Sequence, residues 1–173
     1  MAVSKWREKV IKKIDGEKIF EVGVGTGKNL DVTGIDFSKK MLKIARRKAK
    51  GLDNIKLLEM DGQKMEFDDN SFDTVITSCV FCSVPDPVKG LKEIGRVCKN
   101  NGKIIILEHM RSNNELVGKF MDSINFIPLN IWGANINRKT IEILKKAWFE
   151  AESIESKDIW SDIVKFIEIR NKK

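Results

Sequence analysis

The chain of 173 residues contains no tyrosine, one histidine, three cysteines and three prolines. It also lacks a long apolar run: the longest purely aliphatic stretch, Ile104 to Leu107, is far shorter than the ~20 residues that a membrane-spanning helix needs. No secretory leader precedes the first expected strand, so we expect a cytoplasmic protein. Three cysteines, an odd number within expected regular elements, argue against a disulfide framework.

The charge pattern gives little support to a nucleic-acid partner. The formal net charge is +7, but the basic residues are spread over several expected helices and no aromatic RNA-binding motif accompanies them. A solvated surface is the simpler explanation. The length predicts a single domain over residues 1–173, and the oligomeric state stays open. Abundant lysine, glutamate and isoleucine, together with one glutamine, are typical of hyperthermophile proteins.

The most informative segment is KIFEVGVGTGK, residues 18–28, in which a short apolar strand runs into a turn with alternating glycines. Gly23, Gly25 and Gly27 allow positive φ angles or a close ligand approach. A dinucleotide fingerprint would need its third glycine where this chain has Lys28, and a P-loop would need glycine where it has Val22. The two common phosphate-binding patterns therefore do not fit.

Glu21 lies two residues before the first glycine, where a carboxylate suits a ligand that carries an ammonium group. The methionine end of S-adenosylmethionine (SAM) has such a group. A tight strand-to-helix turn without a ligand is the alternative at this point.

Polar and small residues follow each of the next three expected strands. Because ligands of open α/β sheets bind outside the carboxyl ends of the strands, these positions indicate one crevice. They are Asp36 and Phe37 after residues 32–35, Asp61, Gly62 and Gln63 after 55–60, and Ser78 and Cys79 after 72–77. Ser38 is expected to cap a helix whose inner face carries Met41, Ile44, Ala45 and Ala49.

With EVGVGTG, TGIDFS and the run MDGQKMEFDDNSFDTVITSCVFCSVPDPVKGLKEIGRVCKNNGKIIILEHM in place, residues 16–112 resemble a class I SAM-dependent methyltransferase. The resemblance is greatest to the ubiquinone/menaquinone and bacterial phosphatidylethanolamine N-methyltransferase group, with alkyl-thiol methyltransferases beside them. It implies an α/β, Rossmann-like seven-stranded sheet of order 3-2-1-4-5-7-6, with an antiparallel last strand and helices on both faces. It also implies roles for individual residues: Glu21 and the glycines at the methionine end, Asp36 at the ribose, Phe37 and Met41 at the adenine faces, and Asp61 at the adenine amino group.

One feature departs from that pattern. Only seven residues, Gly25 to Asp31, separate the glycine turn from the second strand, whereas a crossover with its helix takes at least about 10 to 12. Either the helix is cut to about one turn or residues are absent after Leu30, and we favour the second explanation.

The N-terminal residues 1–15 predict a basic amphipathic helix, best defined over residues 4–14. Its apolar side holds Trp6, Val10, Ile11 and Ile14, with lysine and arginine on the rest. Such a helix can lie on an anionic membrane surface. The alternative is a helix packed on the sheet.

In the remaining chain, Asp86 is expected to cap a helix and residues 103–110 a covered central strand. Residues 110–137 are expected to insert a lid, and 148–156 with 160–170 to pair as a hairpin. His109, at the end of the central strand, is a candidate base, with a structural histidine as the alternative, and Glu108 should face the opposite side. We expect no metal site. Expected substrate contacts are Phe81, Phe120 and Trp132.

The sequence therefore predicts a SAM-dependent methyltransferase with an apolar or membrane-associated acceptor, favouring a phospholipid amine. A quinone, a small thiol or a small amine is the alternative acceptor. A SAM-binding regulatory domain without activity is the alternative from another functional class.

Overall fold

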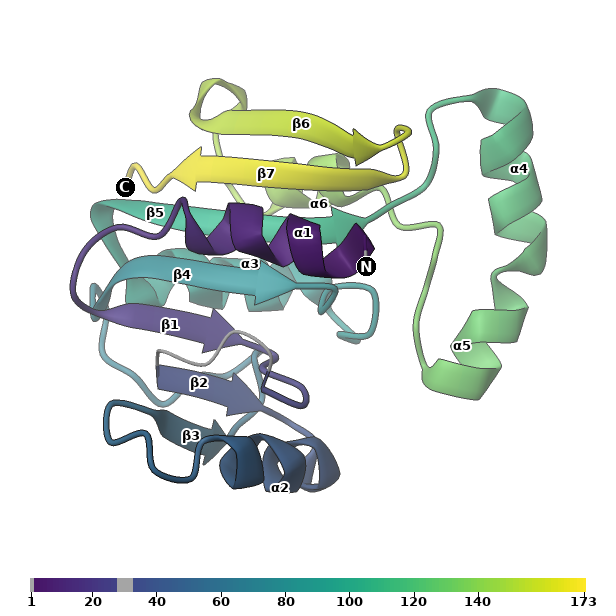
Figure 1. Ribbon diagram of the computed structural model, residues 1–173. Coiled ribbons are helices and arrows are strands. Elements are labelled where there is room, and N and C mark those ends of the chain that lie inside the picture. The colour runs from purple at the N-terminus through teal and green to yellow at the C-terminus, as the bar shows by residue number, and fades with distance from the viewer. Residues whose placement is uncertain (1, 28–32) are drawn as a thin grey trace.

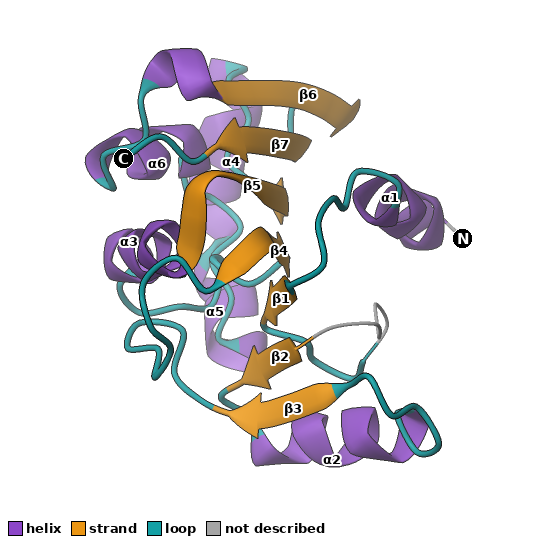
Figure 2. Ribbon diagram, turned by 90° about the vertical axis from the view of Figure 1, so that its left-hand side faces the viewer, coloured by secondary structure: helices purple, strands orange, loops and turns teal. Residues whose placement is uncertain are grey.

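The computed structural model describes residues 2–27 and 33–173, and this part of the chain forms one seven-stranded sheet with helices on both faces (Figures 1 and 2). The strand order is β3-β2-β1-β4-β5-β7-β6, and β7 runs antiparallel to both neighbours, so the predicted topology is confirmed. The strands are β1 (Ile19–Val22), β2 (Thr33–Asp36), β3 (Lys56–Glu59), β4 (Phe72–Ser78), β5 (Cys98–His109), β6 (Ile154–Trp160) and β7 (Val164–Arg170).

The helices divide between the two faces and the carboxyl end of the sheet. In Figure 2, α1 (Ala2–Ile11) lies on one side of the strands, and α3 (Pro87–Val97) and α6 (Thr140–Lys146) lie on the other. The helix α2 (Lys39–Lys48) packs beside β2 and β3. Figure 1 shows α4 (Glu115–Ile124) and α5 (Phe126–Trp132) standing off beyond the carboxyl ends of the strands.

The core is centred on β4 and β5. Ile104, Ile105, Ile106 and Leu107 are almost completely buried, because alternate side chains of β5 enter the two hydrophobic layers. Ile104 and Ile106 join the layer that contains α3, while Ile105 and Leu107 join the layer under α1. A strand covered on both faces is what its continuous aliphatic sequence predicts.

The apolar side of α1 faces the sheet. Val10 is fully buried against the layer that contains Ile105 and Leu107, and the partly buried Trp6 and Ile14 pack on the same layer. Ile11, the fourth apolar residue of the predicted set, is half exposed. The packed arrangement is therefore the one that the structure shows, and Trp6, Val10 and Ile14 do not form a lipid-facing stripe.

The predicted helix caps are confirmed. The Ser38 hydroxyl accepts a hydrogen bond from the Met41 backbone N–H at 3.3 Å, and the Asp86 carboxylate accepts one from the Lys89 N–H at 3.0 Å. Each satisfies one of the amide groups that a helix leaves free at its start.

Several predicted boundaries need correction. In α2 the buried residues are Leu42 and Ala45, while Met41 is turned outwards. The predicted first strand of the hairpin, residues 148–156, is mostly a turn and a short 3₁₀ helix (Ala151–Ser153), and β6 begins only at Ile154. The proposed gap after Leu30 lies outside the described residues.

Arg96 fixes the connection between β3 and β4. Its guanidinium donates to the carbonyls of Met65 (2.9 Å) and Phe67 (2.7 Å), to Asp69, and to the Glu93 carboxylate. Glu93 also accepts from the Met65 N–H at 2.7 Å, and the arginine lowers the pKa of Glu93. One side chain thus holds the interior of a loop, residues 60–71, that has no regular structure of its own.

The last strand is anchored by the residue that follows it. The Asn171 side-chain amide donates to the carbonyls of Gly95, Cys98 and Lys99, and its backbone N–H donates to Gly102 O at 2.9 Å. These bonds fasten the chain end to the α3–β5 turn at the amino edge of the parallel strands, where Figure 1 shows the C-terminus.

We expect Arg96→Met to lower the free energy of unfolding by about 2 to 3 kcal/mol, because two carbonyls and Glu93 lose their charged donor. Urea denaturation measures the change. Arg47→Met, on the exposed side of α2, is the matched control and should change it by less than about 0.5 kcal/mol. Equal losses in the two variants would show that Arg96 does not hold the loop.

Candidate cofactor site

A cavity of about 810 Å³ lies at the carboxyl ends of β1, β2, β3 and β4. This size suits a nucleotide-sized ligand. Most residues predicted from the sequence line it: Glu21, Gly23, Gly25, Asp36, Phe37, Met41, Asp61, Gly62, Gln63, Ser78, Cys79 and Trp132. The four strand ends therefore do converge on one crevice.

The glycine turn is shaped by two different demands. Gly23 has φ +73°, and a Cβ there would lie 2.3 Å from Cγ2 of Val80, so this glycine is required by packing. Gly25 has φ +55°, lines the cavity, and a Cβ there would meet nothing within 4 Å. Gly27 closes the turn through its N–H to Val24 O at 2.9 Å and is not among the described lining residues.

Asp36 joins the end of β2 to the glycine turn. One carboxylate oxygen accepts from the Gly25 N–H at 2.8 Å and the other from the Ser38 N–H at 2.8 Å. A carboxylate has about four acceptor positions, so capacity remains for two ribose hydroxyls. Glu21, almost completely buried in β1, lines the same cavity.

The third strand end is held by Gln63. Its backbone N–H donates to Asp61 at 2.8 Å, its side-chain amide donates to the same carboxylate, and these bonds lower the pKa of Asp61. The Gln63 side-chain carbonyl accepts from the Asp86 N–H at 2.9 Å. The two side chains therefore position each other at the rim of the cavity, and Asp61 stays ionised.

Glu108 belongs to the site although it was not among the predicted site residues; its side chain starts from the face of β5 opposite to His109, as expected. It is completely buried, and its Oε2 accepts from the backbone N–H groups of Val80 (3.1 Å) and Phe81 (2.9 Å), which shapes the turn after β4. Burial raises the pKa of Glu108 to about 7. Its carboxylate also reaches its neighbour: Oε1 lies 3.7 Å from Nδ1 of His109, although the two side chains start from opposite faces of β5. The sequence did carry a signal for this role, because Glu108 is the single acidic residue of the aliphatic strand that was expected over residues 103–110.

The single histidine is held by the backbone. Nε2 of His109 lies 3.2 Å from the carbonyl oxygen of Asn135, and burial lowers the pKa of the ring. His109 is not among the described residues that line the cavity. This geometry favours the structural alternative over the general base.

The three expected substrate residues lie in three different places. Phe81 is 2% exposed and belongs to the main core, where it packs against Gly90, so it does not reach the cavity. Phe120 is exposed on α4 and is not among the described lining residues. Trp132 lines the cavity and remains largely exposed. Arg7 also lines it, which depends on how α1 docks and has no local sequence signal.

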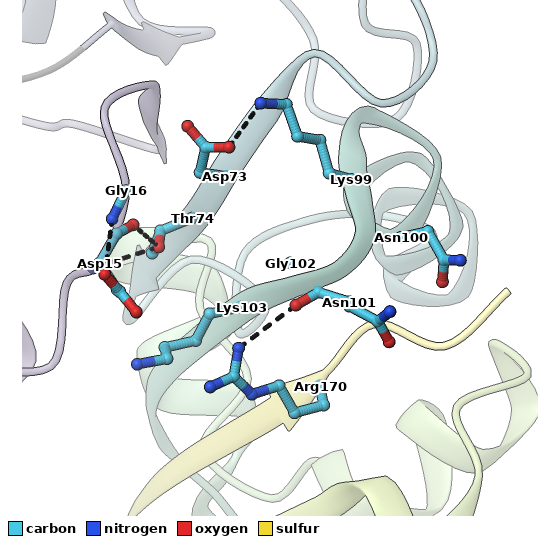
Figure 3. Close-up of a pocket in the computed structure, with 10 residues that line it drawn as sticks. All are labelled: Asp15, Gly16, Asp73, Thr74, Lys99, Asn100, Asn101, Gly102, Lys103 and Arg170. Carbon is cyan, nitrogen blue, oxygen red and sulfur yellow. Dashed lines mark hydrogen bonds and ion pairs between the residues drawn. The ribbon is translucent and has the colours of Figure 1, made fainter.

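A second cavity, of about 210 Å³, lies at the opposite edge of the sheet (Figure 3). Its basic side chains are already engaged: Lys99 pairs with Asp73 at 2.5 Å, Lys103 donates to Lys13 O at 3.0 Å, and Arg170 donates to Asn101 O at 3.2 Å. These side chains are thus occupied by partners within the protein at the amino edge of the parallel strands, so this cavity is explained by the fold.

The methyltransferase domain family matches residues 20–106, just over half of the chain and all four strand ends of the cavity. The chain belongs to this family. Its cofactor is S-adenosylmethionine.

The relatives of this methyltransferase domain have different acceptors in their names. It is 41% identical over 104 residues to the phosphatidylethanolamine N-methyltransferase of Cereibacter sphaeroides, covering 54% of this chain and 51% of the relative. It is 37% identical over 117 residues to the demethylmenaquinone methyltransferase of Staphylococcus aureus strain JH9, covering 60% and 48%. The methyltransferase domain thus spans about half the length of the curated relatives it matches.

Solved structures agree with the fold. An S-adenosylmethionine-dependent methyltransferase of Mesorhizobium loti superposes with a TM-score of 0.71 at 15% identity, covering 96% of this chain and 97% of that one. An SAM-dependent methyltransferase of Methanosarcina mazei gives 0.71 at 19% identity, covering 95% and 98%. None of the described helices is long and apolar enough to cross a membrane.

The residues of the methyltransferase domain fit SAM on physical grounds. The open space beside Gly25 admits a ligand against the backbone, the buried Glu21 carboxylate suits an ammonium group, and Asp36 can accept from hydroxyls. Phe37 and Met41 are exposed apolar side chains at the cavity wall, where an adenine ring can pack.

Gly25→Val should abolish SAM binding, because its side chain would fill the open space that the cofactor enters. Isothermal titration calorimetry measures the affinity. Gly51→Val is the matched control, since Gly51 also has a positive φ (+90°) and open space but is not among the described lining residues. Unchanged SAM affinity in the Gly25 variant would contradict the assignment of the loop.

Asp36→Ala should weaken SAM binding by about 2 to 4 kcal/mol, because two charge-assisted hydrogen bonds to the ribose are lost together with the anchor of the Gly25 N–H. The same titration, run with 5′-methylthioadenosine as well, checks that the loss follows the ribose. Asp53→Ala, in the exposed turn before β3, should leave both affinities unchanged.

Proposed function

We propose that the chain is an enzyme that transfers a methyl group from SAM to the amine of a phospholipid headgroup, with phosphatidylethanolamine as the favoured acceptor. The observation that carries the proposal is the apolar surface of α4 and α5 beside the cofactor cavity. The name of the Cereibacter sphaeroides relative supports the same acceptor.

Many apolar side chains are exposed on the two helices, and α5 contains no charged residue. Its exposed apolar side chains are Leu116, Val117, Phe120, Phe126, Ile127, Leu129, Ile131 and Trp132. Isolated exposed apolar residues are normal, but so many on two consecutive helices beside a cavity are typical of a binding surface. Trp132 belongs to both features, so an acceptor held on the helices would extend into the cavity.

Side-chain and backbone bonds attach the two helices to the segments that precede and follow them. Arg111 pairs with Asp122 at 3.0 Å and lies so close to Gly118 that a Cβ there would be 2.3 Å from Nη1. At the other end, the Asn135 N–H donates to Cys82 O at 2.8 Å, and Asn125 bonds both Asn135 and the Ile136 N–H. The apolar surface is therefore held in place over the carboxyl ends of the strands.

SAM supplies a methyl group on a sulfonium, whose neutral leaving group needs little assistance. The contribution of the chain is to position: Asp36, Asp61 and the glycine turn hold the donor, and the apolar helices hold the acceptor. Correct placement of two reactants accounts for up to about 7 to 11 kcal/mol of a barrier. The headgroup amine is an ammonium ion in water, so it must release a proton to solvent before its lone pair attacks the methyl carbon, and S-adenosylhomocysteine then leaves as a neutral thioether. Nε2 of His109 is bonded to Asn135 O, so this atom has no role as a base in the scheme.

A quinone is the second candidate, supported by the name of the Staphylococcus aureus relative and by the same apolar surface. A small thiol or amine, or a regulatory domain that binds SAM without transfer, requires no such surface. We further propose that the protein works at an anionic membrane surface, to which the exposed lysines Lys5, Lys9, Lys12 and Lys13 contribute while the apolar side of α1 stays on the sheet.

Incubation with SAM labelled in the methyl group, followed by extraction of lipid, quinol, thiol, RNA and protein fractions, should place the label in phosphatidylethanolamine. Trp132→Ala should lower kcat/KM for the lipid about tenfold, equivalent to about 1.4 kcal/mol, and Trp160→Ala, which changes another exposed tryptophan on β6, should leave it unchanged.

Co-sedimentation with anionic vesicles should weaken as salt screens the lysines. Label in quinol alone would replace the lipid by the quinone, and retained SAM binding without transfer to any fraction would favour the regulatory domain. Full activity without vesicle binding would favour a soluble acceptor.

A further inference from the structure

Three potential metal ligands meet where β4 and β5 end. The sulfur of Cys79, a carboxylate oxygen of Glu108 and a ring nitrogen of His109 all lie within 4.8 Å of one another. Cys79 also lines the cofactor cavity, whereas Glu108 is completely buried. Nothing in the sequence spacing indicated this group, because it is formed by the ends of two strands that are neighbours only in the sheet.

Two of these ligands present lone pairs to each other. Nε2 of His109 faces the carbonyl oxygen of Asn135, which can only accept, so the proton of the neutral ring is on Nε2 and the lone pair is on Nδ1. Oε1 of Glu108, 3.7 Å away, is buried and has no hydrogen-bond partner among the described residues. Two buried acceptors in this arrangement need either a shared proton or a cation between them.

We propose that Cys79, Glu108 and His109 bind a zinc ion. Thiolate, imidazole and carboxylate are the ligand types that zinc takes, and three protein ligands leave one position of a tetrahedral ion open. Tetrahedral zinc separates two nitrogen or oxygen ligands by about 3.3 Å, close to the distance between Oε1 and Nδ1. The sulfur of Cys79 would have to move closer to the other two ligand atoms to complete the site.

The supporting contacts that zinc ligands usually have are already present. The Nε2–H of His109 is directed at a backbone carbonyl, and Oε2 of Glu108 is fixed by two backbone N–H groups. Such partners orient ligands before the metal arrives. Cys79 has φ +54°, an uncommon conformation for a residue with a side chain, and strain of this kind often marks a binding position.

Arg138 is the competing partner for Glu108. The two are in electrostatic range, and Nη1 of Arg138 is buried without a hydrogen-bond partner among the described residues. The described hydrogen bonds of Glu108 come from the Val80 and Phe81 amides and none comes from Arg138, whereas the sulfur and the imidazole converge on Glu108. Zinc therefore accounts for the convergence of Cys79, Glu108 and His109, whereas an ion pair would account for Glu108 and Arg138 and leave that convergence unexplained.

The inference does not depend on the methyl acceptor. Chain without a histidine tag is stripped with a chelator and titrated with zinc and with cobalt(II). We expect one ion per chain, a cobalt spectrum with the charge-transfer band of a thiolate and the visible bands of a tetrahedral site, and an unfolding midpoint that rises with zinc.

Cys79→Ser and His109→Gln should each weaken zinc binding at least about 100-fold and remove the tetrahedral spectrum, because ligand loss costs no less than loss of a supporting residue. Cys98→Ser, which changes a buried cysteine at the start of β5, is the matched control and should bind zinc as the parent does.

Far-ultraviolet circular dichroism confirms that each variant is folded, so loss of binding is separated from loss of structure. A folded parent that binds no stoichiometric zinc would overturn the inference and leave Arg138 as the partner of Glu108. Zinc binding that survives in both ligand variants would overturn it as well, since the ion would then be held elsewhere.

Discussion

The parallel ladder from β3 through β2, β1 and β4 to β5 is the constraint on which the rest of the structure depends. Neighbouring parallel strands run in the same direction, so their carboxyl ends lie at the same edge of the sheet. Residues far apart in the sequence, such as Glu21, Asp61 and Cys79, become neighbours of one cavity for that reason alone. The aliphatic centre of β5 is then enclosed between two hydrophobic layers, and the polar groups that line the cavity lie at the strand ends.

Hydrogen bonds from side chains to the backbone set the details of that edge. Asp36 connects β2 to the glycine turn, Gln63 connects the end of β3 to the start of α3, and Glu108 shapes the turn after β4 from within the core. Each of these side chains fixes a loop through a charged or amide group. Each also places a polar group beside the cavity, where it can bond a ligand. The same carboxylates that organise the loops are therefore the groups available to the cofactor.

The parts of the fold that depend on local pattern could be predicted from the sequence. The strand order, the caps at Ser38 and Asp86 and most of the cavity residues follow from glycine spacing, capping residues and the family resemblance. The role of Glu108 could not be predicted, because it depends on amides 27 and 28 residues earlier in the chain. Phe81 was misplaced because residues just after a strand can turn into the core, and Arg7 was missed because docking of α1 decides which side chain meets the cavity.

The hydrogen bonds of Asn171 hold the end of β7 at the edge of the sheet that is opposite to the cofactor cavity. The last strand finishes at the amino edge of the parallel strands, and Figure 1 shows the start of α1 near their carboxyl edge. A fluorophore or surface tether attached behind Asn171 therefore leaves the cofactor entrance clear and allows immobilised chains to face solution with their cavities outwards. A label placed before α1 would lie nearer to the cavity at the carboxyl edge than one placed behind Asn171.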